Sequence, residues 1–159
     1  VECFEKGGRI YIAGNGGSAA DSQHFAAELV CKLSRDRNPI PAEALTTDSS
    51  IITSIANDYS YSQIFARQLE AKLQCNDLFI GISTSGNSEN IIKAFEEAKK
   101  HNVKSILFTG DGGKNKLEIC DYCISVPSKN TAFIQETHIM LLHTLCEAIE
   151  NELIFCKSN

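Results

Sequence analysis

The fold of this chain is decided by residues 9–28, which read RIYIAGNGGSAADSQHFAAE. The apolar run at 9–13 is typical of a buried strand, and the glycines after it predict a turn into a helix that begins near residue 17. The first N–H groups of a helix have no partners within it, so they attract anions. His24 and Glu28 are four residues apart and share one helix face. The stretch therefore predicts an anion or hydroxyl cradle beside two residues that can hold a metal or move protons.

The alternation of strand and helix continues along the chain. We expect strands at 9–13, 40–45, 77–82, 103–108 and 122–126, and helices at 17–33, 48–56, 61–74, 87–101, 114–120 and 131–152. Such alternation predicts an α/β fold, a three-layer αβα sandwich with a five-stranded parallel sheet and right-handed crossovers. We expect residues 1–159 to form a single domain. Residues 2–6 resemble the last turn of a helix before a glycine stop, which predicts that a helical N-terminal segment precedes the chain.

Composition limits the classes of function. The chain has 159 residues, 43% hydrophobic and 22% charged, which is ordinary for one domain with its own core. Its formal net charge is −5 and its basic residues are scattered, so neither nucleic acid nor a membrane is expected as partner. No apolar stretch approaches the roughly 20 residues that span a bilayer. The seven cysteines favour a reducing compartment, and we expect them to be small buried side chains, Cys120 and Cys123 included.

The glycine turn alone also allows an alternative. Gly14, Gly16 and Ala19 match the dinucleotide-binding fingerprint, which would indicate a nicotinamide enzyme. That fingerprint is followed about 20 residues later by an acidic residue at the end of the second strand. Asp36 lies in a polar stretch before the strand, and Asp48 lies farther along. The sequence therefore disfavours a dinucleotide site.

A second loop is more specific. The apolar strand at 77–82 leads into STSGNS at 83–88, and a helix follows. Hydroxyl groups and a glycine thus gather where backbone N–H groups and the helix dipole favour a phosphate. The Gly-Lys-Ser/Thr ending of a nucleotide P-loop is missing, and a single Ser or Thr would be enough to cap the helix. The loop therefore favours a phosphomonoester.

The last helix supplies a third group of polar residues. Gln135 and His143 are separated by about 12 Å along a helix, but long side chains that lean together can still meet at one ion. We expect His138 to be a satisfied core residue and His101 to be solvated. The apolar residues of 131–152 cover more than one stripe of the helix, which predicts a second subunit and hence a homo-oligomer.

Together these motifs closely resemble the phosphoheptose isomerases of the sugar isomerase (SIS) domain family. The resemblance covers about residues 4–152, and its motifs are GNGGS at 14–18 with His24 and Glu28, ANDY at 56–59, GISTSGNS at 81–88, and IQE at 134–136 with His143. It implies a flavodoxin-like SIS domain and an enzyme that converts sedoheptulose 7-phosphate to D-glycero-D-manno-heptose 7-phosphate, toward the ADP-heptose of bacterial surface glycans such as lipopolysaccharide. Members of the family are cytoplasmic homotetramers with active sites at subunit junctions.

The resemblance also assigns roles to residues. The phosphate would be held by Ser83, Thr84, Ser85 and Ser88, and the sugar would be lined by Asn15, Gly16, Gly17, Ser18, Asn57 and Asp58, with Glu28 and Gln135 also touching substrate. Zinc would be bound by His24, Glu28, Gln135 and His143. Two imidazoles, a carboxylate and an amide oxygen suit a catalytic rather than a structural metal. The acid and base roles of the isomerisation would fall to Glu28 and His143, and the alternative is that both serve mainly as metal ligands, because a tightly bound residue is a poor free base.

Other functions use the same domain. A non-catalytic SIS protein that binds a phosphosugar or a replication initiator is the alternative, and retention of His24, Glu28, Gln135 and His143 favours the enzyme. An isomerase for a different phosphosugar is a third reading. Ala132 and Phe133 bear on the choice of substrate. Many relatives carry arginine at the position of Phe133 and some carry aspartate at that of Ala132, and the loss of these charges would alter how the substrate is placed.

Overall fold

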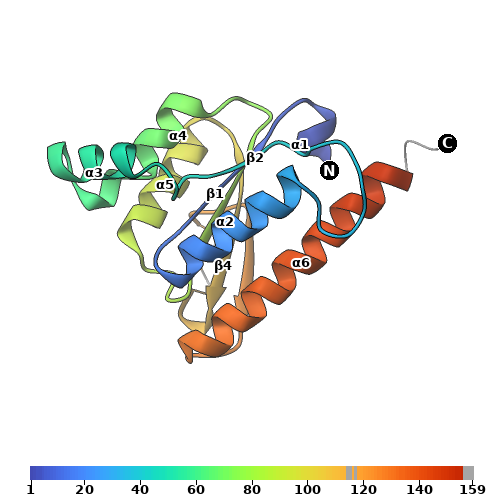
Figure 1. The fold of residues 1–159 in the computed structure, drawn as a ribbon. Coiled ribbons are helices and arrows are strands. Elements are labelled where there is room, and N and C mark those ends of the chain that lie inside the picture. Colours follow the sequence, from blue (N-terminus) through green and yellow to red (C-terminus); the bar gives the residue numbers. More distant parts are fainter. Residues whose placement is uncertain (114–115, 117, 156–159) are drawn as a thin grey trace.

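The computed structural model describes residues 1–113, 116 and 118–155, which form three layers around a central sheet (Figure 1). The sheet has five parallel strands in the order β2-β1-β3-β4-β5. The strands are β1 (Ile10–Gly14), β2 (Ala42–Ala44), β3 (Leu78–Ser83), β4 (Lys104–Gly110) and β5 (Tyr122–Val126). The predicted α/β sandwich with a five-stranded parallel sheet is confirmed.

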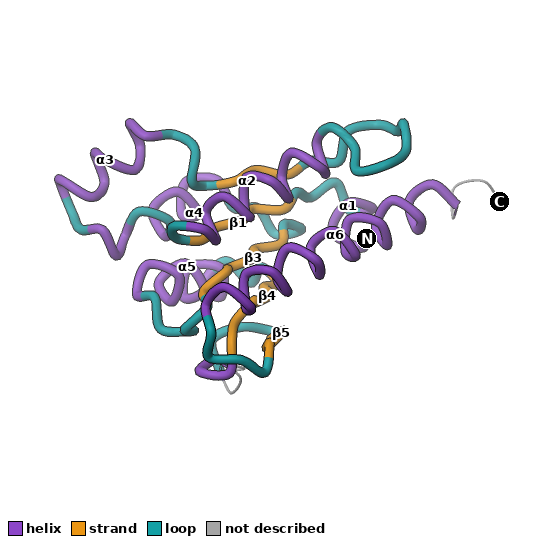
Figure 2. The backbone as a smooth tube through the Cα atoms, turned by 60° about the horizontal axis from the view of Figure 1, so that its bottom comes forward, coloured by secondary structure: helices purple, strands orange, loops and turns teal. Residues whose placement is uncertain are grey.

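Helices cover both faces of this sheet. The α-helices are α1 (Glu2–Glu5), α2 (Gly17–Val30), α3 (Ser49–Asp58), α4 (Ala66–Lys72), α5 (Glu89–Lys100) and α6 (Thr131–Phe155), with short 3₁₀ helices η1 (Tyr61–Gln63) and η2 (Asp111–Gly113). Figures 1 and 2 show α2 beside α6 on one side of the sheet and α4 beside α5 on the other, with α3 projecting beyond α4. The first and last long helices of the chain therefore share one face.

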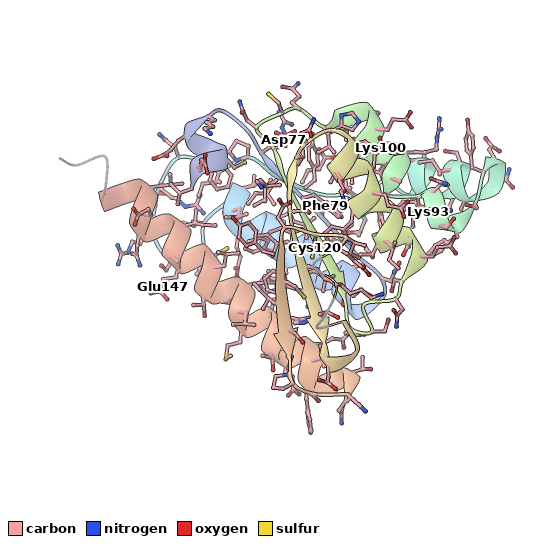
Figure 3. The ribbon with its side chains drawn as sticks, turned by 180° about the vertical axis from the view of Figure 1, so that it is seen from behind. Asp77, Phe79, Lys93, Lys100, Cys120 and Glu147 are labelled. Carbon is pink, nitrogen blue, oxygen red and sulfur yellow. The ribbon has the colours of Figure 1, made fainter. Side chains whose placement is uncertain are left out.

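Successive residues of the central strands face opposite layers. Ile12 of β1 packs in the cluster that includes Leu142 of α6, whereas its neighbour Tyr11 packs with Phe79 and Phe95 on the other face. The rings of Phe79 and Phe95 meet edge to face, with centroids 5.0 Å apart, and Figure 3 shows Phe79 in the interior. Strands buried on both faces give the unbroken apolar runs seen in the sequence.

The strand order places the two polar loops together. From β1 the chain crosses to one side, into β2, and from β3 it crosses to the other, into β4. In open parallel sheets, the crevice at such a reversal lies outside the carboxyl ends of the strands and is the usual ligand site. Here the carboxyl ends of β1 and β3 lead directly into residues 14–18 and 83–88.

The helices differ from their predicted bounds, and for two of them the contacts show the reason. The helix expected at 17–33 ends at Val30, because the Leu29 carbonyl accepts the N–H of Ile40 at 3.0 Å as the chain turns back toward β2. The helix expected at 61–74 is divided into η1 and α4. Ile64 and Phe65 lie between them, and both are buried, so the break directs two adjacent side chains into the core.

Two further elements are shorter than expected. The strand predicted at 40–45 covers only Ala42–Ala44, because Pro41 has no N–H and contributes only its carbonyl, which accepts from Ile10 N–H at 3.0 Å. The short helix predicted at 114–120 falls partly on residues 114, 115 and 117, outside the described residues. Of the remainder, residues 118 and 119 form a turn.

The cysteines follow the prediction only in part. Cys120 and Cys146 are buried, but Cys31 and Cys75 are exposed, so the expectation of burial was wrong for these two. Cys156 lies outside the described residues. Burial raises the pKa of the Cys120 thiol to about 11, and the thiol donates to the carbonyl of Lys116.

The outer surface of α6 carries apolar side chains, with Phe133 and Met140 more than half exposed. The pattern agrees with the expected subunit contact, which stays a prediction. Within the described residues, no helix combines the length and the apolar character that crossing a membrane requires.

Candidate functional site

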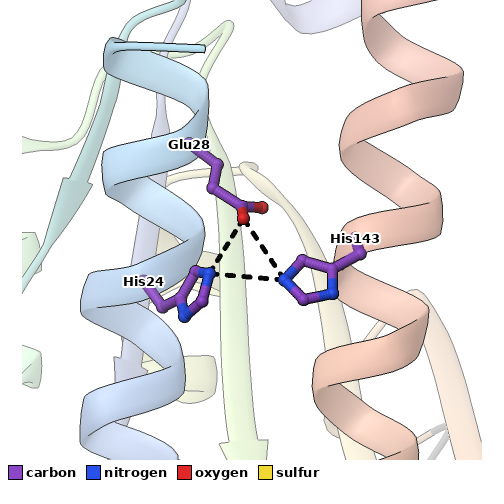
Figure 4. A group of neighbouring side chains, drawn as sticks. All are labelled: His24, Glu28 and His143. Carbon is purple, nitrogen blue, oxygen red and sulfur yellow. Dashed lines mark hydrogen bonds and ion pairs between the residues drawn. The ribbon is translucent and has the colours of Figure 1, made fainter. Parts of the chain in front are cut away.

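Three side chains from the two ends of the chain converge between α2 and α6 (Figure 4). His24 and Glu28 lie one turn apart on α2, and His143 reaches them from α6. Oε1 of Glu28 is 2.8 Å from Nε2 of His24 and 3.2 Å from Nε2 of His143, and the two imidazole nitrogens are 3.3 Å apart. We call these three residues the α2–α6 cluster.

The geometry of the α2–α6 cluster fits a zinc ion. Tetrahedral Zn²⁺ with bonds of about 2.0–2.1 Å requires its ligand atoms to be about 3.4 Å apart. The measured separations of 2.8, 3.2 and 3.3 Å approach that value. Two imidazole nitrogens and a carboxylate oxygen that meet at one point need a shared proton or a cation between them, because facing lone pairs repel. The donor set therefore suits a metal held by nitrogen and oxygen.

The surroundings of the α2–α6 cluster differ on its two sides. The imidazoles of His24 and His143 are about half exposed, so a ligand can reach them, whereas the Glu28 side chain is 13% exposed. Oε2 of Glu28 is buried and has no hydrogen-bond partner among the described residues. On the inner side, burial and the negative charge of Glu28 raise the pKa of the Cys146 thiol to about 12.

The loop after β1 is tied to the helix after β3 by a pair of amides. Asn15 Nδ2 donates to Asn90 Oδ1 at 2.9 Å, and Asn90 Nδ2 donates back to Asn15 Oδ1 at 2.8 Å. Tyr61 Oη also donates to Asn15 Oδ1, at 3.0 Å. Asn90 is buried. The expected sugar-binding residue Asn15 thus ties the loop after β1 to the first turn of α5.

The serine loop closes over the start of α5. The hydroxyls of Ser83 and Ser88 lie 2.9 Å apart, and the N–H of Asn87 donates to Ser85 Oγ at 3.1 Å. Gly86 has a φ of 70°, in the region that favours glycine, and its N–H donates to the Ser83 carbonyl. Ser88 is the N-cap of α5 but its side chain does not cap the helix, so the hydroxyl is not committed to that role.

A cavity of about 270 Å³ lies beside this loop. Its lining includes Thr84, Ser85, Asn87 and Lys129. A phosphate suits the chemistry of such a lining, since hydroxyls and amides donate to its oxygens and a lysine offsets its charge.

The remaining predicted residues fall into two groups. A Cβ built on Gly17 would lie 2.5 Å from Nε2 of Gln135, so this glycine gives Gln135 room at the start of α2. Ser18 is buried next to it. Asn57 and Asp58, in contrast, lie exposed at the end of the projecting helix α3, where Asn57 Nδ2 donates to Asp58 Oδ1 at 2.8 Å. The structure therefore does not bring these two into contact with the α2–α6 cluster.

The other histidines are as expected or nearly so. His138 is fully buried and its Nε2 donates to the Thr109 carbonyl at 3.1 Å, as predicted for a core residue, but its Nδ1 is buried with no hydrogen-bond partner among the described residues, so the ring is only half satisfied. Burial lowers its pKa, and the bond to Thr109 opposes the effect only in part. His101 was expected to be solvated, but it is only partly exposed and lies 3.2 Å from Glu97.

Sequence reasoning missed Asn90 and Tyr61. The signal for Asn90 was a polar residue in the first turn of a helix whose other buried positions, except Glu97, are apolar. Tyr61 carried no such signal, because its contact with Asn15 depends on the break between η1 and α4.

Comparison with known proteins is consistent with this arrangement. A model of the SIS domain family matches residues 1–110. A phosphoheptose isomerase of Aneurinibacillus thermoaerophilus is 52% identical over 155 residues, which cover 98% of this chain and 78% of that protein. The solved phosphoheptose isomerase of Neisseria gonorrhoeae superposes with a TM-score of 0.87 at 43% identity, covering 94% of this chain and 80% of that one. The sugar isomerase domain of an RpiR transcription factor from Sphaerobacter thermophilus shares the fold at 18% identity and a TM-score of 0.58, over 91% of this chain and 72% of that one.

Proposed function

The chain belongs to the phosphoheptose isomerase family of SIS domain proteins, and we propose that it converts sedoheptulose 7-phosphate to D-glycero-D-manno-heptose 7-phosphate. The observation that carries the proposal is the convergence of His24, Glu28 and His143 in a chain about half identical to proteins of that name. The product would enter ADP-heptose and surface glycan synthesis. A phosphosugar-binding regulator shares only the fold, and no feature of this site favours one.

The phosphate end of the substrate binds at the serine loop. Ser83, Thr84, Ser85 and Ser88 donate hydroxyl hydrogen bonds, and the first N–H groups of α5 face the same region with the positive end of the helix dipole. The cavity beside Ser85 supports this assignment. The phosphate then serves as an anchor that fixes the distance of C1 and C2 from the α2–α6 cluster.

The sugar chain binds along the start of α2. Asn15, Gly16, Gly17 and Ser18 line it with backbone and side-chain donors, and Gln135 faces it from α6. The close approach of Gly17 and Gln135 supports a site built from both helices. Asn57 and Asp58 complete the sugar site from a neighbouring subunit, which accounts for their exposed position on α3.

The reaction moves two protons. A base takes the proton from C1, the C–H electron pair becomes the C1–C2 double bond of an enediol, and the C2 oxygen gains a proton. A proton is then returned to C2 while O1 loses its proton, which leaves the aldehyde at C1. We assign these transfers to Glu28 and His143, whose atoms lie 3.2 Å apart and reach the same point, and each acts as acid or base only while the atom that moves the proton is not bound to the metal.

Zinc is the cofactor we propose, bound by His24, Glu28, His143 and the amide oxygen of Gln135. When bound, it would polarise the sugar carbonyl and stabilise negative charge on the enediolate oxygens. The separations within the α2–α6 cluster support the site, and so does the orphaned Oε2 of Glu28, whose buried charge gains from a cation nearby.

We further propose a cytoplasmic homotetramer. The exposed Phe133 and Met140 of α6 support burial against another subunit. Free thiols at Cys31 and Cys75 agree with a reducing compartment. Light scattering at micromolar concentration should give about four times the chain mass, and a monomer would contradict the assembly.

The test is direct. Purified protein is incubated with sedoheptulose 7-phosphate after chelation, with and without added Zn²⁺, and the aldose C1 proton is followed by NMR. In D₂O the enediol route also introduces deuterium at C2. We expect product in the zinc arm, and its absence in every arm would overturn the isomerase and favour a binding role.

A further inference from the structure

An arginine and a glutamate are buried beside the α2–α6 cluster and take no part in the proposed chemistry. The Arg37 side chain is 5% exposed and that of Glu150 is 1% exposed, and Arg37 Nε donates to Glu150 Oε1 at 2.9 Å. Charged groups are almost never buried this deeply without specific partners. The question is what this pair holds.

Arg37 binds the end of α2. Its Nη2 donates to the backbone carbonyl of Glu28 at 2.8 Å, and its Nη1 donates to the carbonyl of Leu29 at 2.8 Å. The last carbonyls of a helix have no partner within it, and Cys31, the C-cap here, adopts no left-handed glycine-type cap. The guanidinium therefore replaces a C-cap and holds the residue whose carboxylate lies in the α2–α6 cluster.

Glu150 binds the loop that follows α2 from the side of α6. Its carboxylate accepts the N–H of Leu33 at 2.9 Å, the hydroxyl of Ser34 at 3.4 Å and the Nε of Arg37. Burial raises the pKa of Glu150, but the hydrogen bonds from Leu33 and Arg37 outweigh it, so the pKa is lowered and the carboxylate is charged.

α2 and α6 are joined at two points, one through the side chain of Glu28 and one through its backbone carbonyl. Glu150 and His143 are seven residues apart on α6, so they lie on the same helix face about 10.5 Å apart along the axis. His143 touches the side chain of Glu28, and Glu150 reaches its backbone through Arg37. Glu28 is thus fixed at both ends to one rigid helix.

We propose that Arg37 and Glu150 are positioning residues that set the separation of α2 and α6 and so prearrange the α2–α6 cluster for its metal and for proton transfer. This inference rests on the proposed metal site. The planar fork of arginine is required, because one group must bind two carbonyls and a carboxylate at fixed angles. Lysine keeps the charge but offers a single nitrogen.

The experiment compares Arg37→Lys with wild type and with Leu69→Ala. Leu69 is fully buried on the opposite face of the sheet, so its truncation lowers stability without touching α2 or α6. Co²⁺ is titrated into chelator-treated protein and followed by visible absorption, and kcat and KM are measured separately. Glu150→Gln is the second variant, in case the first fails to fold.

We expect Arg37→Lys to bind Co²⁺ about 10- to 100-fold more weakly, the usual effect of losing a partner of a metal ligand. Its kcat should fall while KM for the sugar phosphate changes less than about twofold, because the serine loop is untouched. Leu69→Ala should keep the Co²⁺ affinity of wild type. Unchanged affinity and kcat in both Arg37→Lys and Glu150→Gln, or an equal loss in Leu69→Ala, would overturn the positioning role.

A failure of the proposed function is seen separately. If wild type itself binds no Co²⁺, or if His143→Ala binds it equally well, the metal site is wrong and the positioning role falls with it. If wild type binds Co²⁺ at the cluster and Arg37→Lys does the same with unchanged kcat, only the positioning role is wrong.

Discussion

Replacing Glu28 by glutamine removes one charge at the point where two imidazoles meet. Oε1 of Glu28 lies within hydrogen-bond distance of Nε2 of His24 and of His143, at 2.8 and 3.2 Å. An amide oxygen carries no charge, and its NH₂ group cannot accept from either ring. A hydrogen bond to a charged group contributes about 1.5–3 kcal/mol, so the loss of one such contact alone corresponds to a change of roughly 10- to 150-fold in an equilibrium constant.

The loss of acid–base function adds to this effect. A positioned acid or base contributes about 10²- to 10⁴-fold, so kcat of Glu28→Gln should fall at least about 10²-fold, which is about 2.7 kcal/mol or more in the barrier. KM should stay within about twofold, because the phosphate binds elsewhere. The thermal midpoint should change little, since neutralising the buried carboxylate, whose Oε2 has no partner among the described residues, relieves a desolvation cost that offsets the weakened contacts of Oε1.

The assay is aldose formation from sedoheptulose 7-phosphate by NMR at saturating substrate, with Zn²⁺ present. Glu147→Gln is the matched control, because Glu147 is an exposed residue of α6 that Figure 3 shows away from the core, and the same substitution there should leave kcat unchanged. A kcat for Glu28→Gln within tenfold of wild type would refute the assignment of Glu28.

Three further results are expected. Gly17→Ala places a Cβ 2.5 Å from Nε2 of Gln135, so the amide of Gln135 must move. We expect kcat to fall on the order of 10-fold or more, with little change in the urea midpoint. An unchanged kcat would show that the position of Gln135 does not matter for catalysis. Ser85→Ala removes a phosphate donor, so KM should rise about 10-fold at nearly constant kcat, and a constant KM would remove Ser85 from the phosphate site. Because the pKa of His138 is lowered in the folded protein, the unfolded chain takes up a proton at a higher pH than the folded one, and the free energy of unfolding should fall as the pH drops below about 6.5. In urea titrations at several pH values, His138→Gln should lack this dependence on pH. An equal dependence in the variant would assign the effect to other groups.

The fold was predictable because its signals are local. A buried parallel strand must be apolar along its whole length, and a glycine turn must precede each binding helix, so β1, β3 and their loops were visible in the sequence. The ends of the helices were not predictable. The end of α2 at Val30 and the break at Ile64 and Phe65 depend on contacts with residues that lie elsewhere in the chain. Pro41 marked an edge strand but did not give its length.

The candidate site was predictable only as separate pieces. The spacing of His24 and Glu28 showed that they share a helix face, but nothing local in 131–152 distinguishes His143, which meets them, from His138, which is buried in the core. That distinction came from a family resemblance. The pair of Arg37 and Glu150 was invisible for a physical reason, since charged residues in a sequence are read as solvated surface.

The α2–α6 cluster also has a consequence for the order of folding. His24 and His143 are separated by 119 residues, and all five strands lie within or before that interval. A contact of such long range carries a high loop-closure entropy and forms after the local elements are in place. During synthesis, a ribosome-bound chain that lacks α6 cannot assemble the cluster. Metal uptake would therefore report the completion of the tertiary structure.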